Sequence, residues 1–215
     1  QKIAAQLAGS PDVISAEPDY IRQLVKTPDD PRFAEQWDLK TPGAGAYGIN
    51  MPAAWDISTG SSSIVVAIVD TGILPNHPDL SNRLVPGYDF IADVFTANDG
   101  DGRDADPSDP GDWVAAQDFC GFTSGSSWHG SHVAGTIAAA SNNAAGIAGI
   151  NWAAKILPGR VLGKCGGYDS DIIDGLRWAA GLPVQGVPIN LNPARVINLS
   201  LGGSGSCSTI YQETV

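Results

Sequence analysis

Two stretches of the chain carry the clearest hydrophobic patterns. Residues 64–69 are apolar and mostly β-branched, and the run ends abruptly at Asp70 and Gly72. An unbroken apolar run indicates a strand buried on both faces, as in a parallel sheet. Residues 128–138 consist almost wholly of small residues, which favour a helix packed closely against its neighbours inside a domain.

The remaining patterns alternate between strand and helix. Asn50 before Pro52 marks the start of a short helix over 50–56, because Asn caps a helix and Pro is tolerated in its first turn. Helical apolar spacing predicts a crossover helix over 171–179, and capping-box spacing opens another at 209–212. Residues 156–162 and 194–200 read as further strands, although Pro158 should interrupt its ladder. We expect an α/β fold of three layers, with a mostly parallel sheet and helices on both faces.

Length and charge exclude several classes of protein. The 215 residues can bury one sizeable core. The net charge of -11 would repel nucleic acid phosphates. The apolar runs fall short of the roughly 20 residues that a membrane span needs. The first residue is Gln1 rather than Met, so we expect a piece of a longer product, cut at both ends.

The candidate chemistry lies in the two patterned stretches. Working residues of parallel sheets collect just past the carboxyl ends of strands, and Asp70 is at such a position. His129 falls in the first turn of the small-residue helix, where it can face a cleft and exchange protons near neutral pH. A carboxylate can orient a histidine and stabilise its charged form. We therefore expect Asp70 and His129 to converge in a catalytic site.

Three ordered blocks resemble those of the subtilisin-like serine proteases, or subtilases. They are residues 69–72 (VDTG), 129–136 (HGSHVAGT) and 198–203 (NLSLGG), and the likeness covers nearly the whole chain. The resemblance implies a subtilisin-like fold and a secreted endopeptidase, monomeric when complete, in which Asp70 and His129 belong to an Asp–His–Ser triad. The family's nucleophile block, similar to Gly-Thr-Ser-Met-Ala, has no match up to Val215. We expect these residues alone to be inactive.

The same resemblance identifies where a peptide substrate would bind. Glycines at a cleft edge let a peptide backbone come close, and the peptide then adds to the protein as an extra strand. The implied substrate-binding residues are Ser200, Leu201 and Gly202 on one side and Gly166 and Gly167 on the other.

Two calcium sites are predicted. The resemblance implies a structural Ca²⁺ site that ties the mature amino terminus to two distant segments, with a plain Asn/Gly turn as the alternative. Separately, the acidic loop 98–106 has carboxylates alternating with Gly, which suits Ca²⁺, although no Glu closes it as in an EF-hand. The alternative for this loop is a solvated acidic surface. The first ligand set is Asp30, Asp79 and Asn143 with the carbonyls of Ala140, Ala145 and Ile147; the second is Asp99, Asp101 and Asp104.

The two ends of the chain and its three cysteines indicate a secreted protease precursor. Residues 1–26 are similar to the tail of a subtilase propeptide, which would make 27–215 a peptidase domain that is incomplete at its C-terminus; an extension packed on the same domain is the alternative. Three cysteines leave one without an intrachain partner. If their loops frame one cleft, Cys120 and Cys165 can pair, and Cys207 would pair beyond Val215. The resemblance favours an oxidising, extracellular setting over three free thiols in the cytosol.

The sequence leaves two alternatives to a serine protease. His132 follows His129 by one helical turn, so a zinc hydrolase using Asp70 and both histidines is one alternative; otherwise His132 should be buried and hydrogen-bonded. The other is a decayed or truncated protease that acts as a non-catalytic binding module, because no nucleophile is visible.

Overall fold

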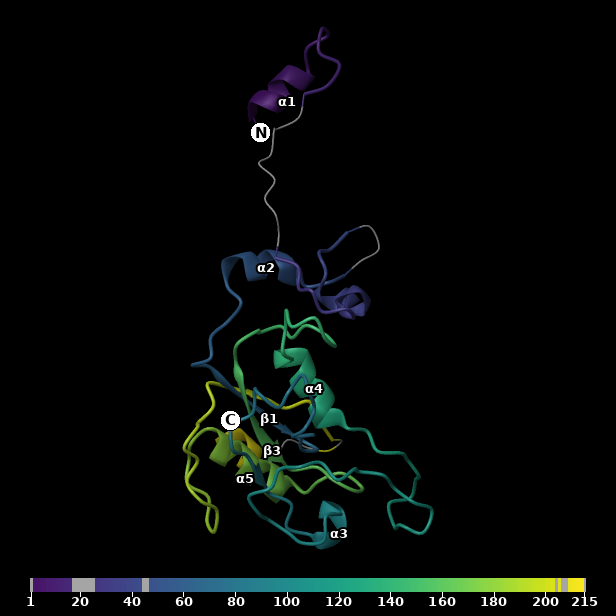
Figure 1. Ribbon diagram of the computed structural model, residues 1–215, viewed down its shortest axis with the longest axis vertical. Helices are drawn as coiled ribbons and strands as arrows, with labels where there is room; N and C mark the ends of the chain where they lie inside the picture. The colour runs from purple at the N-terminus through teal and green to yellow at the C-terminus, as the bar shows by residue number, and fades with distance from the viewer. Residues whose placement is uncertain (1, 17–25, 44–46, 204, 206–208, 215) are drawn as a thin grey trace.

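The computed structural model describes residues 2–16, 26–43, 47–203, 205 and 209–214 (Figure 1). Cys207 and residues 17–25 therefore lie outside the described residues. The helices are α1 (Lys2–Ala8), α2 (Met51–Ile57), α3 (Val94–Ala97), α4 (His129–Ala138), α5 (Asp169–Ala179) and α6 (Thr209–Thr214), with short 3-10 turns at Phe33–Glu35 and Trp37–Leu39; the strands are β1 (Val65–Asp70), β2 (Tyr88–Asp89), β3 (Lys155–Arg160) and β4 (Val196–Asn198).

The four strands form one parallel sheet in the order β2-β3-β1-β4. Strand β1 lies inside the sheet between β3 and β4. Its apolar side chains are buried on both faces, as the unbroken run predicts. Its last residue, Asp70, lies beside Arg160 at the end of β3. The carboxyl ends of the two central strands therefore meet at one edge of the sheet.

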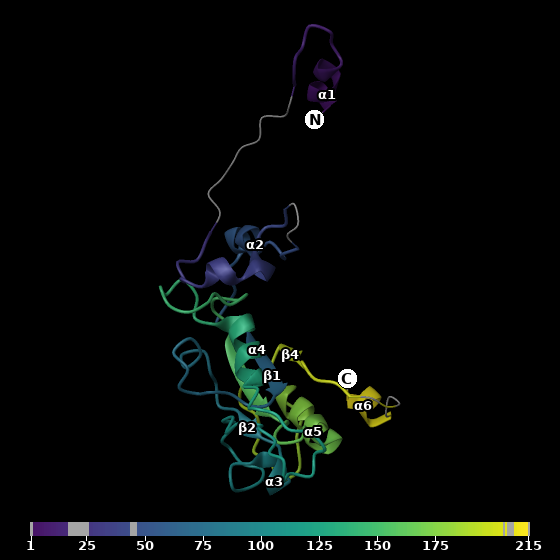
Figure 2. The ribbon, with the colours of Figure 1, turned by 90° about the vertical axis from the view of Figure 1, so that its right-hand side faces the viewer.

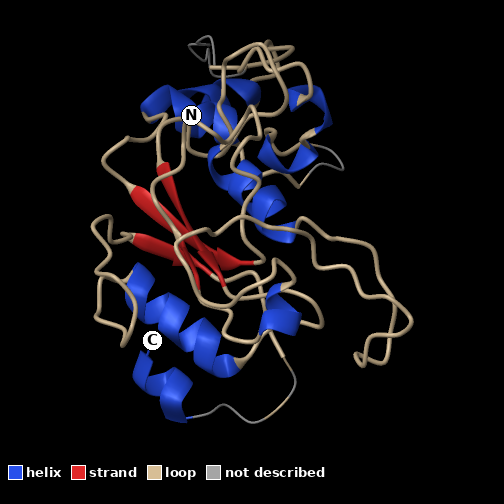
Figure 3. Ribbon diagram, turned by 60° about the horizontal axis from the view of Figure 1, so that its bottom comes forward, coloured by secondary structure: helices blue, strands red, loops and turns tan. Residues whose placement is uncertain are grey.

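Helices cover both faces of the sheet, so the three-layer prediction is confirmed (Figure 3). On one face, Ala134 and Ala138 of α4 pack against Val66 and Ile68 of β1. On the other face, α5 packs Ile172, Leu176 and Trp178 into a cluster with Val69, Phe90 and Leu157. The small residues of α4 thus serve close packing on the sheet, as their composition indicates.

Pro158 does not interrupt its strand, contrary to the expectation from the sequence. It lies inside β3 and opposite Ile68 of β1. On its other side β2 begins only at Tyr88, which pairs with Gly159. A proline lacks only its N–H, and this one occupies a position just before pairing with β2 starts.

None of the helices in the described part of the chain could span a membrane.

Candidate active site

The structure brings Asp70 and His129 into contact. Asp70 ends β1 with its side chain fully buried, and His129 opens α4 with 44% of its side chain exposed. The Nδ1 atom of His129 lies 2.8 and 3.0 Å from the two carboxylate oxygens of Asp70. An ionised carboxylate only accepts hydrogen bonds, so Nδ1 carries the proton and donates it. Atom Nε2 is then left as an acceptor for a proton from a substrate or nucleophile.

A backbone contact sets the distance between the strand and the helix. A Cβ built on Gly130 would lie 2.2 Å from the carbonyl oxygen of Gly72, so no larger residue fits at this junction. The N–H of Gly130 donates to the Thr71 hydroxyl at 3.0 Å. Because α4 starts directly against the turn after β1, His129 can reach Asp70.

A cleft of about 910 Å³ opens beside His129. All five residues predicted to bind substrate line this cleft together with His129: Gly166, Gly167, Ser200, Leu201 and Gly202. Asp112, Ser127 and Asp169 also line it and were missed in the sequence. The position of Ser127, two residues before His129, could have indicated that it lines the cleft. Asp112 accepts hydrogen bonds from the N–H and the hydroxyl of Ser127 at 2.6 and 2.7 Å, and nothing in the sequence around Asp112 indicates this contact.

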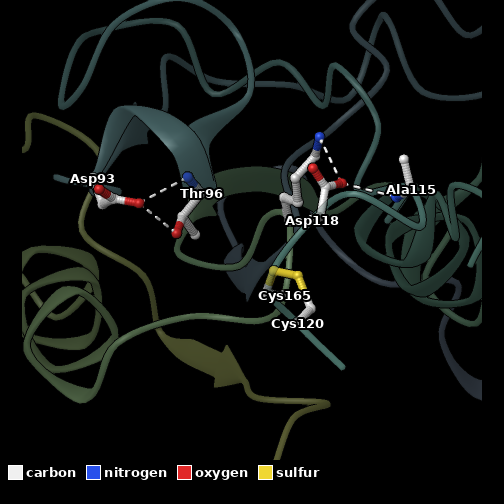
Figure 4. The surroundings of a disulfide bond; sticks show 7 residues. Asp93, Thr96, Ala115, Asp118, Cys120 and Cys165 are labelled. Carbon is white, nitrogen blue, oxygen red and sulfur yellow. Dashed lines mark hydrogen bonds and ion pairs between the residues drawn. A yellow bond between two sulfur atoms is a disulfide. The ribbon is translucent and has the colours of Figure 1, made fainter. Parts of the chain in front are cut away.

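A disulfide joins two loops at this cleft. Cys120 is bonded to Cys165 with the two Cα atoms 5.5 Å apart (Figure 4), and Cys165 lines the cleft. Beside the bridge, the buried Lys164 ammonium lies 3.2 Å from Asp118 and about 5 Å from the rings of Phe95 and Trp113. The loop before α4 is thus fixed to the loop after β3.

The three segments of the first predicted calcium site lie together. Asp30 and Asp79 are both buried, the N–H of Asn142 donates to Asp30 at 2.7 Å, and the amide of Asn143 donates to Asp79 at 3.3 Å. The second carboxylate oxygen of Asp30 is buried without a hydrogen-bond partner. A buried carboxylate oxygen needs a donor or a cation, so the residues present fit a bound cation.

The three acids of the second predicted calcium site are not grouped together in the structure. Asp99 accepts a hydrogen bond from the buried Arg160 guanidinium instead. The N–H of Asp101 donates to Asp99, and Asp104 accepts from the N–H of Asp106. Within the described residues no three acidic, His or Cys side chains are grouped to hold a metal. The positive charge beside Asp99 is therefore supplied by Arg160 of the protein itself.

The other histidines have no metal-binding arrangement. His132 is exposed on α4 rather than buried as expected, and it belongs to no metal-binding group in the described part of the chain. His77 accepts from the N–H of Asp79 at 3.2 Å. The zinc alternative therefore lacks a ligand set.

A buried ion pair lies at the edge of the sheet that carries Asp70. The Arg160 guanidinium donates to Asp89 and to the carbonyl of Ala97, and the side chains of Arg160 and Asp89 are almost wholly buried. Burial raises the pKa of Asp89 to about 7, against the opposing effect of Arg160. This pair anchors the end of β3 next to Asp70.

Comparison with known proteins decides the family. The profile of the subtilase family (Peptidase_S8) matches residues 61–214. The chain belongs to the subtilase family. Both catalytic candidates of this subtilase lie within the matched range.

Several subtilases are closely similar to this one. The extracellular protease of Xanthomonas campestris is 51% identical over the whole chain, and the extracellular basic protease of Dichelobacter nodosus is 47% identical over 97% of it. The chain spans 37% and 35% of the length of these two relatives. Among solved structures, a protease from Pseudoalteromonas arctica matches with a TM-score of 0.81 and 56% identity, covering 88% of this chain and 55% of that one.

Proposed function

We propose that this chain supplies the Asp and the His of a secreted serine endopeptidase, and that the serine comes from outside these 215 residues. The observation that carries the proposal is the contact between a buried Asp70 and a half-exposed His129 at the wall of a large cleft. The disulfide at that cleft and the extracellular relatives support secretion.

The chemistry follows from the geometry of the pair. Asp70 holds the proton of His129 on Nδ1, so Nε2 can take a proton from the serine hydroxyl as that hydroxyl attacks a peptide carbonyl. The charged imidazolium that results is stabilised by the adjacent carboxylate. Backbone N–H groups at the cleft would hold the developing oxyanion.

The substrate would bind as an added strand. Gly166 and Gly167 stand on one side of the cleft and residues 200–202 on the other. Backbone groups exposed at these positions can pair with an extended peptide, which favours protein and peptide substrates over small esters.

The test is labelling with a fluorophosphonate, which reacts with activated serines. The full-length protease should be labelled and should cleave casein, and His129→Ala should abolish both. The matched control is His132→Ala, an exposed histidine on the same helix, which should leave both unchanged. Labelling of the 215-residue chain alone would refute the external serine, and an inactive full-length protein would favour the binding module.

We also propose that Ca²⁺ binds between Asp30, Asp79 and the 140–147 loop. The support is the buried, unpartnered oxygen of Asp30 and the meeting of these three segments. When bound, the ion would neutralise two buried carboxylates and fix the segment around Asp30 to the body of the domain.

Residues 1–26 are proposed to be the tail of an inhibitory propeptide. Helix α1 stands apart from the sheet in two views (Figures 1 and 2), and its apolar Ile3 and Leu7 are exposed. Such side chains need a partner, which the rest of a pro-segment would provide. A synthetic 1–26 peptide added to the mature protease should inhibit it, and equal inhibition by a scrambled peptide would contradict the proposal.

A further inference from the structure

One buried carboxylate near the catalytic pair has no part in the chemistry described so far. The side chain of Asp109 is buried. One oxygen accepts the Thr71 hydroxyl at 2.8 Å, and the other accepts the N–H of Gly111 at 2.8 Å. The segment is also fixed by backbone bonds, from Ile73 to Pro107 at 3.0 Å and from Asp109 to Ile73 at 2.8 Å. Asp109 is therefore held rigidly against the turn that follows β1.

Thr71 is the residue through which Asp109 reaches the catalytic pair. Its backbone N–H donates to the Asp70 carboxylate at 2.7 Å. Its hydroxyl accepts from the N–H of Gly130, the residue after His129, at 3.0 Å. A hydroxyl has one proton to donate, and the Asp109 carboxylate accepts it. The hydroxyl's lone pairs are thereby directed at the first turn of α4.

We propose that Asp109 is a positioning residue for the Asp70–His129 pair, acting through the Thr71 hydroxyl. It fixes the direction of that hydroxyl, which joins the end of the strand carrying Asp70 to the start of the helix carrying His129. The catalytic consequence rests on the proposed protease function, whereas the effect on the geometry of His129 does not.

An amide cannot replace the carboxylate at this position. Two donors, the Thr71 hydroxyl and the Gly111 N–H, point at the two oxygens of Asp109. Asparagine offers one oxygen and one NH₂ group, so one of the two donors would face another donor. With asparagine, either the Thr71 hydroxyl or the Gly111 N–H is therefore left without an acceptor.

The kinetic test compares Asp109→Asn with Asp101→Asn in the full-length protease. Asp101 is an exposed carboxylate in the acidic loop 98–106 and serves as the matched control. We expect kcat to fall between about 10- and 100-fold for Asp109→Asn with KM within about twofold, since small misplacements of catalytic groups cost rates of this order. Asp101→Asn should match the wild type. Thr71→Val should reproduce the loss, Thr71→Ser should restore activity, and combining Thr71→Val with Asp109→Asn should cost no more than Thr71→Val alone.

A spectroscopic arm tests the geometry without any peptidase activity. The 215 residues contain three histidines. Their ring ¹⁵N signals in the full-length protease are assigned by substituting each histidine in turn, and those of His77 and His132 report whether the variant is folded. We expect Asp109→Asn and Thr71→Val to shift the Nδ1 proton of His129 and to leave the other two unchanged. If Asp109→Asn does not fold, Thr71→Val decides alone.

The outcomes separate this inference from the proposed function. An unshifted His129 signal, additive losses in the double variant, or a loss that appears only in KM or in thermal stability would overturn the positioning role. A full-length wild type without activity would refute the protease proposal, and the His129 signal would still decide for or against Asp109.

Discussion

Replacing Asp70 by Asn removes the charge beside His129 while keeping the shape of the side chain. In the structure both carboxylate oxygens lie within 3.0 Å of Nδ1, and the carboxylate is fully buried. Asparagine offers only one acceptor oxygen, and its NH₂ group can donate to Nδ1. That donation would favour the ring form with its proton on Nε2, which cannot accept from a serine.

The size of the effect follows from the distance. With charge centres about 4 Å apart and an effective dielectric constant of about 20, the attraction is about 4 kcal/mol, or roughly 10³-fold in rate. Water around the half-exposed imidazole reduces this to about 10²-fold. The wrong ring form lowers the rate further, and in a serine protease triad the same substitution lowers kcat by about 10⁴-fold. We therefore expect kcat to fall by about 10³- to 10⁴-fold.

The assay is hydrolysis of a peptide anilide by the full-length protease at neutral pH. Asp101→Asn, which removes an exposed charge from the acidic loop, is the control and should be unchanged. Asp70→Asn with kcat within tenfold of the wild type would refute the assigned role of Asp70. Circular dichroism measures the folded fraction of the variant. The comparison with the wild type is then made on kcat per folded molecule.

Three further outcomes are expected. Chelation of Ca²⁺ should lower the melting temperature of the wild type but not of Asp30→Asn, and equal shifts in both would argue against the calcium site. Replacing Cys120 and Cys165 by Ser should lower the free energy of unfolding by about 2–4 kcal/mol, because the bridge closes a loop with a sequence separation of 45; an unchanged urea midpoint would contradict this. Burial raises the pKa of Asp89 from 3.8 to about 7, so folding favours its protonated form. The stability of the wild type relative to Asp89→Asn should therefore fall across that pH range, and a rise would show that contact with Arg160 outweighs burial.

The sequence predicts those parts of the site that depend on local pattern. The apolar run ending at Asp70 and the small-residue stretch after His129 each carry their own signal, because burial on both faces and close packing restrict which residue types fit. The parallel sheet and the three layers then follow from the alternation of strand and helix, whereas the order of the strands does not. The edge of the sheet that carries Asp70 can therefore be predicted from the sequence alone.

Contacts between distant loops could not be predicted in the same way. The acidic loop has the composition of a calcium site, but its Asp99 pairs with Arg160, which lies 61 residues away in the sequence. Asp109 has no distinguishing pattern around it in the sequence, and its contact with Thr71 depends on how the segment after the acidic loop folds back. Pro158 was misread because the start of β2, one position beyond it, is not visible in the pattern.

The junction of Gly72 with Gly130 has a consequence for how this protein can change over evolution. Since the two backbones touch with no side chain between them, the reach from carboxylate to imidazole cannot be retuned by exchanging residues there. The stretch between Asp112 and Ser127 is anchored at both ends by hydrogen bonds between those two residues. Within this stretch Cys120 is fixed by its bond to Cys165. Changes of length on either side of Cys120 cost little chain entropy, so under the proposed function we expect substrate preference to change there while the Asp70–His129 pair stays in place.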